Sequence, residues 1–112
     1  MAKKTVKYIS SGILSASKTL EACSGEILQI ELWTDGKNNA ELIIYDSPSD
    51  LVSADTAICG LAVPGASIYK SLSLPKKTGF EIGLRCELSG EGAKYIIIYK
   101  RFWKEKVGGG EK

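Results

Sequence analysis

The stretch Phe80-Glu81-Ile82-Gly83-Leu84-Arg85-Cys86-Glu87-Leu88 decides the fold class of this chain. Its apolar residues alternate without error with Glu, Gly, Arg and Glu. Because successive side chains of a β-strand point to opposite faces, this pattern predicts one strand over residues 80–88 with one buried face. Other segments with strand-like composition, each bounded by turn residues, flank it on both sides. They are Thr5–Ile9, Lys18–Ala22, Glu26–Thr34, Ala40–Asp46, Ala57–Val63, Ser67–Leu74 and Ala93–Phe102.

We expect an all-β protein, because no long stretch carries apolar side chains at the three-four spacing of a helix. About eight antiparallel strands in 112 residues favour a single two-sheet β-sandwich of the jelly-roll type. An immunoglobulin-like sandwich is the alternative, and a closed barrel is less favoured. Trp33 does lie between Cys23 and Cys86, but Leu84 stands where immunoglobulin domains carry a Tyr.

Two of these segments, Leu42–Tyr45 and Tyr95–Tyr99, are apolar on both faces. Such strands are typical of the centre of a sheet, with the partner sheet on one side and a subunit or long loop on the other. Residues 47–55 form a longer polar connection, which we expect to cross between sheets or to be an exposed loop. We expect one domain over residues 1–107 and a flexible Gly-rich tail over residues 108–112.

The composition excludes several kinds of chemistry. The chain has no His, so it lacks the usual acid–base group at neutral pH and the commonest metal ligand. Its three Cys form no CxxC pair and are odd in number, which argues against a zinc site and a closed disulfide framework. We interpret Cys23, Cys59 and Cys86 as buried free thiols in a reducing compartment. We therefore expect no catalytic residue, no metal, no cofactor and no enzymatic activity.

The ends of the chain carry no recognisable export or membrane signal. The basic residues 1–8 are not followed by the apolar run of a signal peptide. The longest apolar runs are far shorter than the roughly 20 residues that a membrane-spanning helix needs. We expect a soluble protein that is made in a cytoplasm and has no membrane partner.

Charge is distributed unevenly along the chain. Residues 1–20 carry a net charge of +4, residues 21–55 carry −7, and residues 56–112 carry +5. Regions of opposite charge attract copies of the same chain or a partner surface. The simpler interpretation is that these charges form solvated faces that keep the protein in solution.

Aromatic side chains on the strands are the candidates for an interaction site, because exposed aromatics stack on sugars or anchor protein interfaces. The segment 94–106 interleaves aromatic and basic residues, as sites for single-stranded nucleic acid do. It also fits a final strand with a basic edge, or an oligomer contact. The interface candidates are Trp33, Tyr45, Tyr69, Tyr95, Tyr99, Arg101 and Trp103.

The order of turns and strands carries a resemblance to a known group of proteins. The relevant stretches are Ser11–Leu20, Asp35–Gly36, Leu42–Asp46, Val63–Ser67 and Leu88–Tyr99. This layout, which covers nearly all of residues 9–100, resembles small β-sandwich proteins encoded among the structural genes of tailed bacteriophages. Members of such families are virion components: decoration or cement proteins on the capsid, or parts of fibres and tail appendages.

The resemblance implies a non-enzymatic protein that binds the viral particle and stabilises it, with the major capsid protein or another virion protein as its partner. It implies a location in the virion after synthesis in the host cytoplasm, and a homo-oligomer, of which we favour a trimer. The alternatives are a fibre or tail-appendage subunit, and a carbohydrate-binding module that uses Trp33, Tyr69 or Trp103. Binding of single-stranded nucleic acid through Tyr95–Lys106 is a further alternative that we favour less.

Overall fold

The computed structural model describes residues 8–102, except for the side chains of residues 75–77. Eight strands form one β-sandwich, and two short 3-10 turns, η1 (Ala54–Thr56) and η2 (Gly65–Ser67), lie between strands. Within the described chain, no helix is long and apolar enough to cross a membrane. The strands are β1 (Tyr8–Ser10), β2 (Lys18–Glu21), β3 (Gly25–Trp33), β4 (Ala40–Tyr45), β5 (Ala57–Val63), β6 (Tyr69–Phe80), β7 (Leu84–Ser89) and β8 (Lys94–Arg101).

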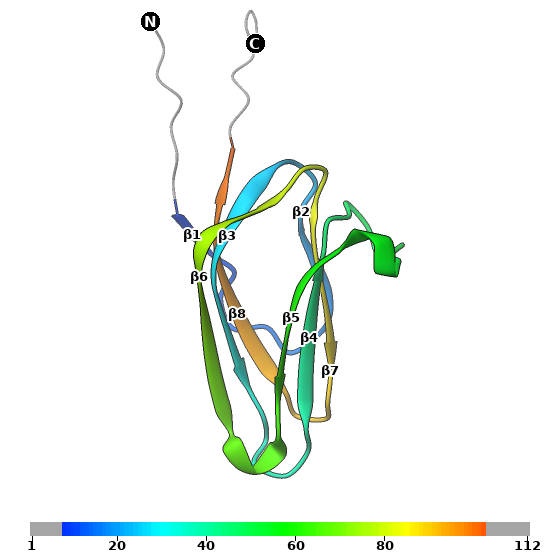
Figure 1. Cartoon of the computed structure of the whole chain (residues 1–112). Helices are drawn as coiled ribbons and strands as arrows, with labels where there is room; N and C mark the ends of the chain where they lie inside the picture. Colours follow the sequence, from blue (N-terminus) through cyan, green and yellow to red (C-terminus); the bar gives the residue numbers. More distant parts are fainter. Residues whose placement is uncertain (1–7, 103–112) are drawn as a thin grey trace, which may run out of the picture.

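The strands form two four-stranded antiparallel sheets. The first sheet has the order β1-β8-β3-β6 and the second has the order β2-β7-β4-β5. The pairs β1–β8, β2–β7, β3–β6 and β4–β5 are those of one long antiparallel ribbon folded back at the β4–β5 hairpin. Rolling up this ribbon adds the pairs β3–β8 and β4–β7, which gives a jelly roll (Figure 1). The predicted jelly-roll sandwich is confirmed, and the immunoglobulin-like alternative is wrong.

The core lies between the inner faces of the two sheets. The central strands β3, β8, β4 and β7 supply most of it, so the predicted central position of Leu42–Tyr45 and Tyr95–Tyr99 is confirmed. Full burial of one large apolar side chain contributes about 1.5 to 3 kcal/mol. The largest fully buried side chains are Ile27, Ile30, Leu32, Leu42, Ile44, Val63, Phe80, Leu84, Cys86, Tyr95 and Ile97.

The predicted strand over residues 80–88 is wrong in one respect, because it is two strands with a turn between them. Phe80 is the last residue of β6 in the first sheet, and residues 84–88 belong to β7 in the second sheet. Between them, the Asp46 carboxylate accepts hydrogen bonds of 2.9 to 3.1 Å from the backbone N–H groups of residues 81–83. Ile82 is 55% exposed in this turn, although its place in the alternation predicted burial.

The connection over residues 47–55 joins β4 to β5, which are neighbours in one sheet. It does not cross between the sheets. Of the two predicted alternatives, a crossing connection and an exposed loop, the exposed loop is therefore correct. Ser47 is buried at its start, and its hydroxyl oxygen lies 3.0 Å from the carbonyl oxygens of Ser49 and Leu51. Contacts between the Ser47 side chain and the loop backbone therefore hold the loop, and Leu51 is 82% exposed.

The three thiols are free, as predicted, but only Cys86 is fully buried. Cys23 and Cys59 are half-buried, so the prediction of buried thiols is too strong for these two. Burial raises the pKa of the Cys86 thiol from 9.0 to about 12. Burial is also the main reason why the pKa values of Cys23 and Cys59 are raised.

Two predictions fall partly or wholly outside the described residues. The first predicted strand, Thr5–Ile9, is described from Tyr8 onward, where it belongs to β1. The predicted tail over residues 108–112 lies outside the described chain.

Candidate interaction surface

The outer face of the first sheet carries the residues of a candidate interaction surface. Strand β3 is central in this sheet, and its register against β6 and β8 places the outward side chains in rows. Trp33 lies directly opposite Tyr69 of β6 and Lys94 of β8. In the next row, Glu31 lies opposite Ser71. The register thus brings together side chains from three segments that are far apart in the sequence.

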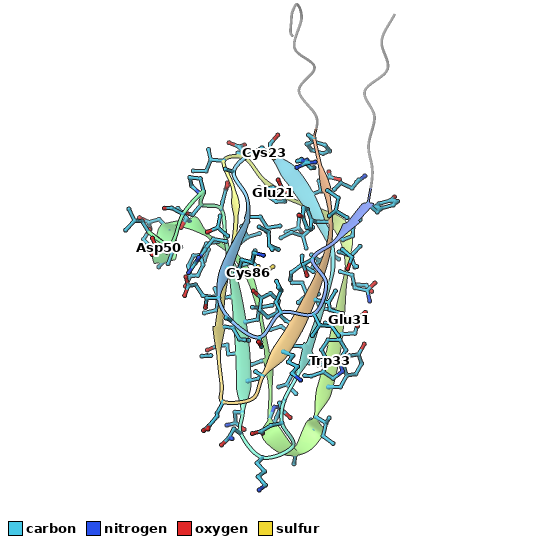
Figure 2. The ribbon with its side chains drawn as sticks, turned by 180° about the vertical axis from the view of Figure 1, so that it is seen from behind. Glu21, Cys23, Glu31, Trp33, Asp50 and Cys86 are labelled. Atoms are coloured by element: carbon cyan, nitrogen blue, oxygen red, sulfur yellow. The ribbon has the colours of Figure 1, made fainter. Side chains whose placement is uncertain are left out.

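Trp33 and Tyr69 pack against each other on this face. Their ring centroids are 5.2 Å apart and the ring planes are inclined by 39°. Tyr69 is 44% exposed, and the preceding residue, Ile68, is 53% exposed. We call Trp33, Ile68 and Tyr69 the aromatic patch. Figure 2 shows Trp33 and Glu31 on the same side of the sandwich, away from Cys86 in its interior.

Ile68 has an unusual backbone conformation, with a φ of 70°. It is the only residue other than Gly with a positive φ in the described part of the chain. A β-branched residue in this region costs about 1 to 3 kcal/mol and persists only where neighbouring structure enforces it. Here the N–H of Ile68 donates to the carbonyl of Gly65, and its own carbonyl accepts from the N–H of Thr34, at 3.2 and 2.7 Å. The fold therefore holds an exposed apolar side chain in a fixed position beside Tyr69.

A polar ladder borders the aromatic patch. The side-chain amide of Gln29 donates to a carboxylate oxygen of Glu31 at 2.7 Å, and it also donates to the hydroxyl oxygen of Ser71 at 3.3 Å. The ladder lies on the same outer face as Trp33, since these residues of β3 share its parity. The aromatic rings offer contact to an apolar surface. The amide, carboxylate and hydroxyl groups beside them offer hydrogen bonds to a hydroxyl-rich surface.

Two of the predicted interface residues, Tyr95 and Tyr99, are wrong as interface candidates, because both point into the core. They are 0% and 3% exposed. The Tyr95 hydroxyl donates to the carbonyl of Ala16 at 2.8 Å, and the Tyr99 hydroxyl donates to Glu21 at 2.7 Å. Burial raises the pKa of both phenols, and the hydrogen bond to Glu21 raises that of Tyr99 further. Both side chains tie the last strand to residues 16–21.

The other predicted interface residues do not join the aromatic patch. Arg101 forms an ion pair with Glu21, with 3.2 Å between Nη1 and Oε1. Tyr45 is half-buried on the outer face of the second sheet, where it lies opposite Arg85. Trp103 lies outside the described residues. The patch therefore unites only Trp33 and Tyr69 of the candidates.

The described part of the basic segment 94–106 does not form a continuous cationic surface. The Lys100 ammonium lies 3.3 Å from Glu26, and Arg101 pairs with Glu21 as described above. Lys94 is six residues from Lys100, which corresponds to about 20 Å along a strand. Carboxylates thus already neutralise two of these cations. The described segment therefore supports binding to nucleic-acid phosphates less well than the uncharged aromatic patch supports binding to a protein or a sugar.

No site of another kind emerges from the described residues. Within residues 8–102, no group of three or more Asp, Glu or Cys side chains is placed to hold a metal ion. A depression beside β4, β5 and β7 contains one carboxylate, that of Glu41, and no cationic side chain. It therefore lacks the pair of titratable groups that acid–base catalysis uses.

Comparisons of the sequence with protein-family models and with curated proteins find no match. The function therefore has to be inferred from the fold and from the described surface.

The polar ladder was not predicted, although the sequence contains one signal for it. Gln29 and Glu31 alternate with buried Ile30 and Leu32, so Trp33 shares their parity and belongs on a solvent-facing side. Ile68 had no such signal, because an isolated β-branched residue gives no indication of a positive φ.

Proposed function

We propose that this protein is a non-enzymatic virion protein of a tailed bacteriophage, which binds the particle as a capsid decoration or cement protein and stabilises it. The observation that carries the proposal is the aromatic patch, an exposed apolar surface held in a fixed position on a jelly roll. The resemblance in turn and strand order to small phage β-sandwich proteins supports the class of partner. That partner is the major capsid protein or another virion protein.

Docking through the aromatic patch has a clear physical basis. Aromatic side chains contribute a large share of the energy of protein interfaces. Ile68 and Tyr69 are 53% and 44% exposed, so the fold itself leaves apolar surface in water that a partner can cover. Full burial of one such side chain contributes about 1.5 to 3 kcal/mol. A protein that binds only the assembled particle stabilises it by mass action.

Add-back to particles tests this proposal. Particles assembled without the protein are mixed with purified protein, the bound fraction is measured after sedimentation, and the thermal stability of loaded particles is recorded. Tyr69→Ser should weaken binding about tenfold or more, because it removes the most exposed ring of the patch. Tyr8→Ser is the matched control, because Tyr8 is 69% exposed on the same face but lies at the opposite end, across from Lys100.

The two variants show whether binding depends on the aromatic patch. Weakened binding by Tyr69→Ser with unchanged binding by Tyr8→Ser supports docking through the patch. The proposal is wrong if particles that lack the protein take up none of it. If both variants bind like the unmodified protein, the contact lies elsewhere and the patch has no part in it.

Carbohydrate binding is a second candidate, which the polar ladder favours. Tyr69 offers a ring face for stacking, and Glu31 and Ser71 lie in the adjacent row with groups that bind sugar hydroxyls. A glycan array should then give hits that Tyr69→Ser abolishes and that Glu31→Gln weakens, while Tyr8→Ser keeps them. An array without hits would contradict this candidate and leave the particle-binding proposal untouched.

A further inference from the structure

The edge strands of the sandwich differ in how well they are protected. An exposed edge presents unpaired backbone groups, and proteins guard such edges with short strands, charges, Pro or bulges. Strand β2 has only four residues, with a charge at each end. Strand β6 contains Lys70, Pro75, Lys76 and Lys77, and its register against β3 is interrupted. The β2 and β6 edges thus resist pairing.

Strand β5 lacks this protection. Its sequence, Ala57-Ile58-Cys59-Gly60-Leu61-Ala62-Val63, contains no charged residue and no Pro. Within residues 8–102 it pairs with β4 alone and ends the order of the second sheet. A register shift leaves Ile58 without a partner on β4, and Pro64 follows the strand. The regular part is therefore Cys59–Val63, with Leu61 at its centre.

The direction of the backbone groups of β5 follows from alternation across the second sheet. Leu88 of β7 donates its N–H to a hydroxyl on the side of β2, so it does not bond its opposite residue on β4, Leu42. Leu42 consequently directs its N–H and C=O to Leu61 of β5. Since this direction alternates along a strand, Gly60 and Ala62 direct theirs to the open edge. Both of these residues are exposed.

We propose that β5 is a self-pairing edge, at which two copies of this chain join through antiparallel β5 strands about a two-fold axis at Leu61. In this register, Gly60 of each copy faces Ala62 of the other, and each such pair exchanges both of its backbone hydrogen bonds. The second sheets of the two copies then become one continuous sheet. The proposal does not depend on the proposed function.

A second copy is the occupant that the strand itself indicates. The regular part is symmetric about Leu61, because the unpaired Ile58 bounds it on one side and Pro64 on the other. Every cross-strand pair in this register is uncharged, with Cys59 opposite Val63 in the outer positions. Gly60 and Ala62 are also small, so no side chain obstructs the joined outer face. The same patch on both copies gives a closed, isologous contact.

The two-fold geometry has two consequences. It predicts a dimer, or an even-numbered assembly built on it, in place of the trimer that we expected from the sequence. It also brings the β6 edges of the two copies to the same side, where Lys70 is exposed. Association should therefore strengthen from low salt to about 0.15 M salt, at which like charges more than about 8 Å apart are largely screened.

Analytical ultracentrifugation of the full chain from micromolar to millimolar concentration tests the proposal. The unmodified protein should shift from monomer to dimer as concentration rises. Ala62→Pro removes one outward N–H from each strand and leaves the bonds to β4 intact, since Pro is tolerated at a solvent-facing edge position. This variant should remain a monomer and keep the circular dichroism spectrum of the fold.

A second variant protects the test against misfolding of Ala62→Pro. Ala62→Lys places charges beside the two-fold axis, and Ser89→Lys is its matched control at an exposed position on the same face, away from the open edge. We expect loss of the dimer in Ala62→Lys and its retention in Ser89→Lys. A protein that stays monomeric at all concentrations overturns the proposal. So does a dimer that persists in a folded Ala62→Lys or Ala62→Pro variant.

Discussion

Two pairs of aromatic residues, Tyr95 with Tyr99 and Trp33 with Tyr69, lie on opposite faces of the same sheet. The first pair faces inward and is at most 3% exposed, with both hydroxyls bonded to residues of the 16–21 segment. The second pair faces outward, where Tyr69 keeps 44% of its surface in water. The difference is one of strand parity, since a shift of one position exchanges the inner and outer faces.

This contrast separates the side chains that stabilise the fold from the side chains that are available to a partner. Inward aromatics are fixed by packing and by hydrogen bonds to residues 16–21, so they stabilise the fold. Outward aromatics contact each other and leave apolar surface in water that a partner can cover. Substitutions inside should therefore change stability, whereas substitutions outside should change binding.

The largest expected effect concerns the reactivity of the inward thiol beside Tyr95. Burial raises the pKa of Cys86 to about 12, three units above the 9.0 of a free thiol, so its thiolate fraction near pH 8 is lower about a thousandfold. Alkylation followed by mass spectrometry should find Cys86 inert in the folded protein and reactive in denaturant. Modification of Cys86 as fast as that of half-buried Cys23 would contradict the inward placement.

The same shift gives a direction for stability against pH. The folded state holds the Cys86 proton more tightly than the unfolded state does, because its pKa is raised. Its contribution is fully present below about pH 9 and is lost as the pH rises toward 12. Urea unfolding at increasing alkaline pH should show this loss, and Cys86→Ala should reduce it.

The second effect compares one Tyr on each face. Tyr95→Ala should lower the free energy of unfolding by about 3 to 5 kcal/mol, because it opens a cavity in the core and removes the bond to Ala16. Tyr69→Ala should change it by no more than about 1 kcal/mol, since the ring is already partly in water. Urea unfolding measures both values. Similar losses for the two variants would remove the distinction between the faces.

A smaller effect tests the strained backbone next to Tyr69. Ile68→Gly should be more stable than Ile68→Ala by about 1 kcal/mol, because only Gly accepts a φ of 70° without steric cost. Both variants remove the exposed side chain, so the comparison isolates the backbone term. Equal stability of the two would show that Ile68 is unstrained in solution.

The smallest effect is the coupling between the two outward rings. A double-mutant cycle with Trp33→Ala and Tyr69→Ala should give a coupling of about 0.5 kcal/mol, the low end for aromatic pairs because this one is exposed. The readout is again urea unfolding. Strict additivity would mean that the rings do not pack together in solution.

Alternation and turn residues were enough to predict most of the strands and the jelly roll. The predicted strand over Ala57–Val63 agrees with β5 residue for residue. The segment 80–88 was misjudged because the group that breaks it, the Asp46 carboxylate, is about 35 residues away in the sequence. Local periodicity cannot register a hydrogen bond from a distant side chain, and here the alternation happened to continue through the turn.

The candidate site was only partly predictable for a related reason. Trp33 and Tyr69 were both selected, but their contact depends on the pairing of β3 with β6, which a single sequence does not specify. Tyr95 and Tyr99 were selected wrongly because both faces of β8 are mixed in polarity. The half-buried Ile96 and Ile98 made its outer face as apolar as the inner one.

Strands β1 and β8 carry the chain into and out of the sandwich side by side. Tyr8 lies opposite Lys100, and the Cα atoms of such a pair are about 5 Å apart. The aromatic patch lies at the other end of the first sheet, where Trp33 of β3 meets Tyr69 of β6. The domain is thus suited to grafting into a surface loop of a carrier protein, with short linkers and with its patch displayed outward. Whether such a graft is displayed singly or in pairs would then depend on the open edge of β5.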